Sequence, residues 1–113
     1  MKTVVIEDIR PDNDYGLIVQ MPEEGNVYQD DYFYWKGSLI PACFQTNRIS
    51  TGTMKTWHRD PVFQKLEFHE DYEKFVFLTG TALFPVADTR DGAVCDESFR
   101  VLRVSPGTEV LVP

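Results

Sequence analysis

The sequence predicts an all-β fold, from its short apolar runs, its turn residues and its lack of helical periodicity. The apolar runs are four to seven residues long and rich in Val, Ile, Phe and Tyr, which suit a half-buried pleated surface. Clusters of Gly, Pro, Asn and Asp separate these runs. No window of 11 or more residues carries a sustained apolar stripe of helical period. Many short strands at regular spacing favour a sandwich or a small barrel.

The N-terminal half alternates apolar runs with turns. Its predicted strands are Thr3–Ile6, Gly16–Gln20, Tyr32–Lys36 and Arg48–Met54. The turns Pro11–Asp14 and Pro22–Asn26 separate the first three, because these residue types favour turn conformations.

The C-terminal half follows the same pattern. Its predicted strands are Val62–Phe68, Lys74–Leu78, Ala82–Ala87, Phe99–Val104 and Glu109–Val112. Asp91-Gly92 is typical of a tight hairpin turn, and Ser105-Pro106-Gly107 predicts the turn before the last strand.

Length and charge limit the class of protein. With 113 residues the chain suits one domain, residues 1–113. A net charge of -7 argues against binding nucleic acid or anionic membrane surfaces, which both require basic patches. No apolar run is long enough to span a bilayer. Because Cys43 and Cys95 form no disulfide framework, we expect two buried free thiols and a cytoplasmic location.

Two stretches are unusually aromatic. The first holds Tyr28 and the run Tyr32–Trp35, and the second holds Trp57, Phe63 and Phe68. We expect these rings to fill the core, since aromatic side chains bring large buried areas to small β domains. Lining of a ligand pocket, or a dimer face, is the alternative.

Three polar side chains carry the chemistry that the sequence predicts. Glu67 and His69 are two residues apart on a predicted strand, so they share a face, and Glu73 begins the next strand. If the two strands pair as a hairpin, the three side chains converge. An imidazole with two carboxylates suits a divalent metal such as Zn, Mn, Fe or Ni. The same groups would serve as a general acid and base without metal.

Each candidate also has a simpler interpretation. His69 could be a hydrogen-bonded core histidine, Glu73 a solvated carboxylate, and Glu67 an ion-pair partner of a neighbouring lysine. Arg59 is a candidate substrate ligand because its guanidinium suits a carboxylate, although loop arginines are commonly solvated.

The spacing around these residues resembles the first motif of the cupin superfamily. In that motif a His-x-His pair is followed by Glu and then by Gly, and here His69, Glu73 and Gly80 match the last three positions. Glu67 replaces the first histidine, and the motif's opening Gly is absent. Gly107 and Pro113 match the start of the second cupin motif, whose histidine would lie beyond Pro113.

The resemblance implies a double-stranded β-helix, a barrel similar to a jelly roll, with a site in its mouth and homodimeric assembly. The stop inside the second motif leads us to expect that the last strands are missing. The Tyr15–Ile18 run, the residues from Leu66 to Phe75 and the strand after Gly80 resemble the ureidoglycolate lyase group most closely. Such enzymes split ureidoglycolate into glyoxylate and urea.

Catalytic roles for His69 and Glu73, and metal ligation by Glu67, His69 and Glu73, follow from this resemblance. A non-catalytic cupin that binds a sugar or a small organic acid is the first alternative. A structural dimer module, with Tyr32–Trp35 at its interface, is the second.

Overall fold

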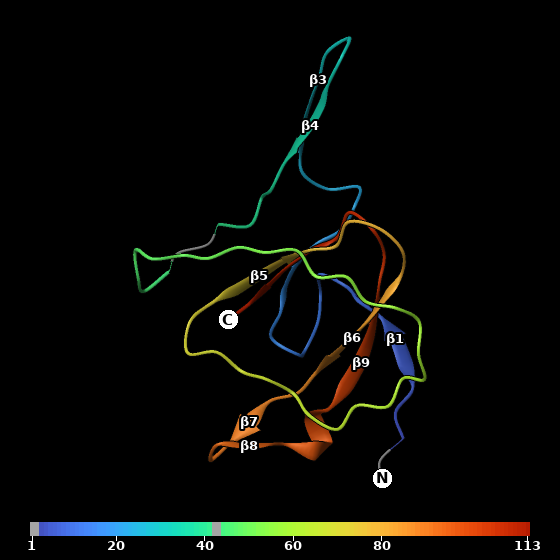
Figure 1. Ribbon diagram of the computed structural model, residues 1–113, viewed down its shortest axis with the longest axis vertical. Helices are drawn as coiled ribbons and strands as arrows, with labels where there is room; N and C mark the ends of the chain where they lie inside the picture. Colours follow the sequence, from blue (N-terminus) through green and yellow to red (C-terminus); the bar gives the residue numbers. More distant parts are fainter. Residues whose placement is uncertain (1–2, 42–43) are drawn as a thin grey trace.

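A computed structural model describes residues 3–41 and 44–113, and it confirms the predicted all-β class (Figure 1). The strands are β1 (Ile6–Asp8), β2 (Ile18–Gln20), β3 (Asn26–Gln29), β4 (Tyr34–Gly37), β5 (Glu73–Val76), β6 (Ala82–Val86), β7 (Thr89–Arg90), β8 (Ala93–Val94), β9 (Arg100–Val104) and β10 (Glu109–Val112). A single 3₁₀ turn, η1 (Asp96–Ser98), precedes β9 in the described chain.

Two three-stranded sheets form the body of the protein. In the first, of order β1-β9-β6, β9 pairs parallel with β1 and antiparallel with β6. In the second, of order β2-β10-β5, all pairing is antiparallel. Two separate hairpins, β3–β4 and β7–β8, complete the pairing. No pairing within the described ranges closes these sheets into a barrel.

The two sheets share one apolar core. Strand alternation turns Leu102 and Val104 of β9 and Val110 of β10 inward, and all three side chains are fully buried. Phenylalanine rings from β5 and β6 pack against them, with the centroids of Phe75 and Phe84 5.2 Å apart. The body is therefore a small sandwich whose central strands, β9 and β10, supply most of the buried apolar surface.

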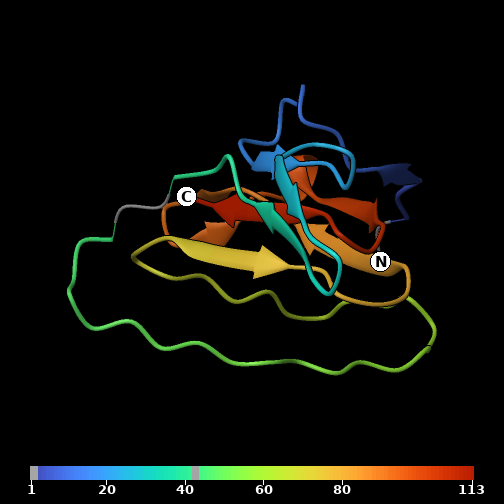
Figure 2. The same ribbon diagram turned by 90° about the horizontal axis from the view of Figure 1, so that it is seen from above.

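Two predicted strands, Arg48–Met54 and Val62–Phe68, are wrong. Residues 44–72 contain no strand and run along the outside of the sheets (Figure 2). Their large apolar side chains, including Met54 and Trp57, are mostly exposed. Strand propensity depends on burial and on a pairing partner, and this segment has neither.

The bounds of the other predicted strands differ by at most three residues from those observed, and the short strands β3, β7 and β8 were missed. β3 begins at Asn26, the last residue of the predicted Pro22–Asn26 turn, and β7 and β8 flank Asp91-Gly92. That hairpin turn is confirmed, because Asp91 (φ 54°) and Gly92 (φ 78°) both adopt the positive φ that a type I′ turn requires. The turn before β10 is also confirmed, with Gly107 at φ 88°.

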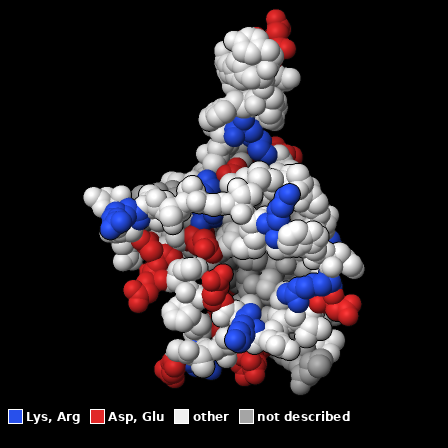
Figure 3. All heavy atoms as spheres, in the orientation of Figure 1, with Lys and Arg blue, Asp and Glu red and all other residues white. Residues whose placement is uncertain are grey.

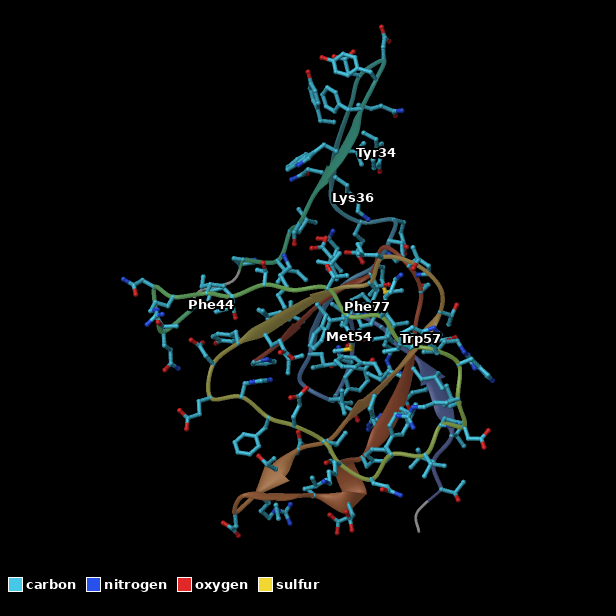
Figure 4. The ribbon with its side chains drawn as sticks, viewed as in Figure 1. Tyr34, Lys36, Phe44, Met54, Trp57 and Phe77 are labelled. Carbon is cyan, nitrogen blue, oxygen red and sulfur yellow. The ribbon has the colours of Figure 1, made fainter. Side chains whose placement is uncertain are left out.

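The β3–β4 hairpin, residues 26–37, projects from the body, and we call it the arm (Figure 1). Its aromatic side chains are Tyr28, Tyr32, Phe33, Tyr34 and Trp35, and all of them are exposed. The prediction that this cluster fills the core is therefore wrong. Figure 3 shows the arm as a mostly uncharged column with acidic groups at its tip, and Figure 4 shows Tyr34 and Lys36 on it, away from Phe77 in the body.

A buried polar cluster fixes the base of the arm. The Gln20 side-chain amide donates to Glu109 Oε2 at 3.0 Å and accepts the Leu39 N–H at 2.6 Å. Lys74 pairs with Glu109 at 3.2 Å, so this residue, which alternation alone would leave on the surface, is partly buried. Lys36 Nζ donates to the Pro22 carbonyl at 2.5 Å across the arm's base. The chain on both sides of the arm is thus anchored at its base.

Arg100 ties the N-terminal segment to the first sheet. Its guanidinium contacts Glu7 at 3.0 Å and Asp14 at 2.8 Å and lies over the Tyr15 ring. The hydrogen bond to Glu7 is the main cause that raises the pKa of Arg100, which favours the charged guanidinium further.

The prediction of two buried free thiols can be compared with the structure at Cys95 only. Cys95 is a free, half-buried thiol whose Sγ lies 3.0 Å from Glu97 Oε2, and Cys43 lies outside the described residues. Nowhere in the described chain is there a helix of the length and apolarity needed to cross a bilayer.

Candidate acid–base site

His69 and Glu73 form the closest pairing of an imidazole with a carboxylate in the described chain. His69 Nε2 lies 3.2 Å from Glu73 Oε2 and 3.9 Å from Glu67 Oε2. The first is a close contact of a nitrogen with a carboxylate oxygen, and the second is a loose one. The side chains of His69 and Glu73 are 49% and 39% exposed, so solvent and a small ligand can reach both.

The three predicted site residues therefore lie together, but for a different reason from the one predicted. We expected a hairpin between Val62–Phe68 and Lys74–Leu78, whereas β5 pairs with β10 and residues 62–68 form no strand. His69 instead reaches Glu73 across a short turn, from a position four residues earlier.

Asp71 shapes that turn. One of its carboxylate oxygens accepts the Tyr72 N–H at 2.7 Å, and the other accepts the Gln45 N–H at 2.8 Å. The two bonds connect the turn to the beginning of the exposed 44–72 segment. Asp71 is therefore a structural residue that orients the chain between His69 and Glu73.

Strand alternation places Glu73 at the edge of the core. It is the first residue of β5, opposite Val112, and it is two residues before Phe75, whose ring packs in the core. Residues two apart on a strand share a face, so Glu73 lies on the inner face of the second sheet, where the strand begins. The His69–Glu73 pair thus borders the space between the two sheets.

The predicted metal ligands do not form a complete set. Two donors on one metal ion, each about 2.1 Å from it, lie about 3.0–3.4 Å apart, a range that the His69–Glu73 distance meets and the His69–Glu67 distance exceeds. Within residues 3–41 and 44–113, no group of three or more His, Cys, Asp and Glu side chains is arranged to hold a metal ion. The geometry fits an acid–base pair better than a metal centre.

Arg59, the predicted substrate ligand, contacts its own loop. Its guanidinium donates to the Val62 carbonyl at 3.2 Å and stacks over the Phe63 ring with 5.6 Å to the centroid. Together with Gln64 and Lys65 these residues line a hollow of about 420 Å³. None of the described ion pairs joins Arg59 to a carboxylate, so its charge is available to an anionic ligand there.

A second hollow, of about 360 Å³, lies between the first sheet and the chain that follows β2. It is lined by Asp8, Ile9, Met21, Thr81, Arg103 and Ser105. Arg103 is neutralised there by Asp8 at 2.9 Å. Neither hollow includes His69 or Glu73 in its lining.

Sequence reasoning missed the buried cluster of Gln20, Glu109 and Lys74. Its one signal is Glu109, a carboxylate at the head of the otherwise apolar strand Val110–Val112. An ionised group at such a position requires partners once it is buried, and the partners come from strands far away in the sequence.

Comparisons of the chain with protein-family models, with curated proteins and with solved structures give no match.

Proposed function

We propose that this chain is a cupin-type domain that acts on a small organic acid, in a reaction resembling that of ureidoglycolate lyase. The observation that carries the proposal is the 3.2 Å approach of His69 Nε2 to Glu73 Oε2 at the inner edge of β5. The all-β fold and the His69, Glu73, Gly80 spacing support it. The barrel closure and the homodimer of that family belong to the proposal.

The reaction needs one group that accepts a proton and later donates it. In ureidoglycolate a single carbon carries the hydroxyl, the carboxylate and the urea nitrogen. Neutral His69 accepts the hydroxyl proton, the C–O bond becomes the carbonyl of glyoxylate, and the C–N electron pair moves to urea. The imidazolium then returns the proton to the urea nitrogen, so the protons balance.

Glu73 acts on this cycle through charge. Its carboxylate stabilises the imidazolium that forms on His69 and holds the ring in one orientation. Glu67, at 3.9 Å, adds a weaker favourable charge. Arg59 and Lys65 line a hollow that does not include His69 or Glu73, so binding of the substrate carboxylate by Arg59 rests on the match of a guanidinium to a carboxylate.

Metal ligation by Glu67, His69 and Glu73 stays a prediction from the sequence, and no step of this mechanism depends on it.

The test is glyoxylate release from ureidoglycolate by the purified protein. We expect measurable turnover, with a loss of at least about 100-fold in kcat/KM for His69→Ala and a comparable loss for Glu73→Gln. The matched control is Glu70→Gln, which removes an exposed carboxylate next to the site and should leave turnover unchanged. An inactive wild-type protein, or equal losses in the variants and the control, overturns the proposal.

A non-catalytic binding module is the second candidate. The openness of the site favours it, since the side chains of His69, Glu73 and Glu67 are 49%, 39% and 81% exposed and neither hollow includes His69 or Glu73. Such a module would be stabilised by a sugar or a small organic acid without converting it. A ligand-induced rise in melting temperature with no product therefore distinguishes it from the enzyme.

A further inference from the structure

The arm is a two-stranded ribbon without further support. β3 pairs only with β4 among the described strands, and the aromatic side chains that both strands carry are exposed. An isolated two-stranded hairpin is marginally stable in water, because it buries too little apolar surface. The polar cluster at Gln20 fixes the base of the arm, but nothing within residues 3–41 and 44–113 covers its outer part.

One face of the arm is aromatic. Tyr28 and Trp35 are directly opposite each other in the register, so they share a face. The Asp30 N–H donates to the Phe33 carbonyl at 3.0 Å, which continues the register and brings Phe33 to the same face. The ring centroids of Tyr28 and Phe33 are 5.7 Å apart in a stacked pair, and Tyr32 meets Phe33 edge-on at 5.4 Å.

The opposite face is mixed. It carries Val27 opposite Lys36, and Gln29 opposite Tyr34. The arm therefore has two different sides, although Tyr34 and Trp35 are equally exposed, at 60% and 58%.

The aromatic face has the size of an interaction site. With about 200 Å² for each aromatic side chain and the exposed fractions of Tyr28, Tyr32, Phe33 and Trp35, it presents about 500 Å² of exposed ring surface. Contiguous apolar patches of this size on soluble proteins mark binding surfaces. Two such faces together bury about 1,000 Å², the lower limit of a specific protein–protein interface.

We propose that the aromatic face of the arm docks against the same face of a second copy of this chain. A two-fold axis pairs one patch with itself, so a single patch supplies both halves of the buried area. The proposal gives an interface to the homodimer that the proposed function includes, and it is independent of the activity at His69.

The charge at the tip of the arm favours one relative orientation of the two arms in the dimer. Asp30 and Asp31 lie at the tip, which Figure 3 shows as acidic. A parallel arrangement would bring four carboxylates together at one end, at a cost in repulsion. An antiparallel arrangement places the two acidic tips at opposite ends of the interface. We therefore assign the antiparallel arrangement.

The test is the molar mass in solution, measured by light scattering and by sedimentation over a range of concentrations. The wild-type chain should have twice the 13.0 kDa of one copy. Trp35→Ser should raise the dimer dissociation constant at least tenfold, because interfacial Trp and Tyr carry much of the binding energy. The matched control, Tyr34→Ser, removes an equally exposed ring from the other face and should leave the dissociation constant unchanged.

A second variant separates docking from folding of the arm, because the Trp35 indole also lies over Gly37. Tyr28→Ser leaves that contact intact and should weaken the dimer as Trp35→Ser does. Far-UV circular dichroism and the melting temperature at low concentration report folding of the monomer. A monomeric wild-type chain at high concentration overturns the proposal. So does a dimer that Trp35→Ser and Tyr34→Ser weaken equally, or one that neither Trp35→Ser nor Tyr28→Ser weakens.

Discussion

The side-chain amide of Gln20 donates to Glu109 Oε2 at 3.0 Å, between two strands whose sequence positions are 89 residues apart. Gln20 is 2% exposed and Glu109 is 8% exposed. The Gln20 carbonyl oxygen accepts the Leu39 N–H, and its amide nitrogen lies 3.4 Å from the Glu24 carbonyl oxygen. One buried amide therefore connects the second sheet to the chain on both sides of the arm.

Replacing this amide by an apolar group should cost stability. Gln20→Leu leaves the Leu39 N–H without its partner and removes one donor from the buried Glu109 carboxylate. We expect the free energy of unfolding to fall by about 1–3 kcal/mol, measured by urea denaturation. The control is Gln29→Leu on the exposed arm, which should change stability by less than about 0.5 kcal/mol. Equal effects of the two substitutions would contradict a structural role for the Gln20 bonds.

Leu102 should be among the most sensitive positions in the core. Its side chain is fully buried in the middle of β9, between two neighbouring strands. Leu102→Ala should lower the free energy of unfolding by about 2–5 kcal/mol, through lost burial and the cavity left behind. Val5→Ala, at an exposed apolar position, serves as the comparison in the same denaturation experiment and should be nearly neutral. A cost below 1 kcal/mol for Leu102→Ala would mean that the two sheets do not pack as described.

His69 should matter little for stability. Its contact with Glu73 is about half-exposed, and even a fully charged pair at such a position contributes about 0–1 kcal/mol. We therefore expect His69→Ala to shift the free energy of unfolding by less than about 1 kcal/mol in a chemical denaturation experiment. A much larger loss of unfolding free energy would show that His69 has a structural role. The loss of turnover in His69→Ala could then not be assigned to the chemistry of the imidazole.

Bound metal can be measured directly. Elemental analysis of protein prepared without a histidine tag should give well below one equivalent of Zn, Mn, Fe or Ni, because the described donors form no complete ligand set. His69→Ala is analysed in parallel. Near-stoichiometric metal that this variant loses would restore the metal site that the Glu67, His69 and Glu73 pattern predicts.

The sequence predicted the strands that the core needs. Val110 and Leu102 lie in short runs with consecutive apolar residues, and both predicted runs became strands with bounds within one residue. Asp91-Gly92 was equally clear, because the conformation that a tight hairpin demands is rare for other residue pairs.

The errors share a physical cause. Local composition and alternation suggested strands at residues 48–54 and 62–68, and aromatic content suggested core rings at residues 32–35, but burial depends on which segments pair. The contact of His69 with Glu73 was predicted, whereas the buried Gln20–Glu109 contact was not. Local spacing was enough to bring His69 to Glu73, whereas the Gln20–Glu109 contact joins positions too distant for any local pattern.

The parallel pairing of β1 with β9 has a consequence for how the chain folds. Ile6 lies opposite Val101, and Asp8 meets Arg103 across a sequence separation of 95 residues. Closing so long a loop costs entropy before any contact is gained, which slows folding in proteins of high contact order. During synthesis on the ribosome, β1 must wait for nearly the whole domain to emerge before it finds its partner. We expect slow, post-translational acquisition of the first sheet, with β1 exposed to chaperones in the meantime.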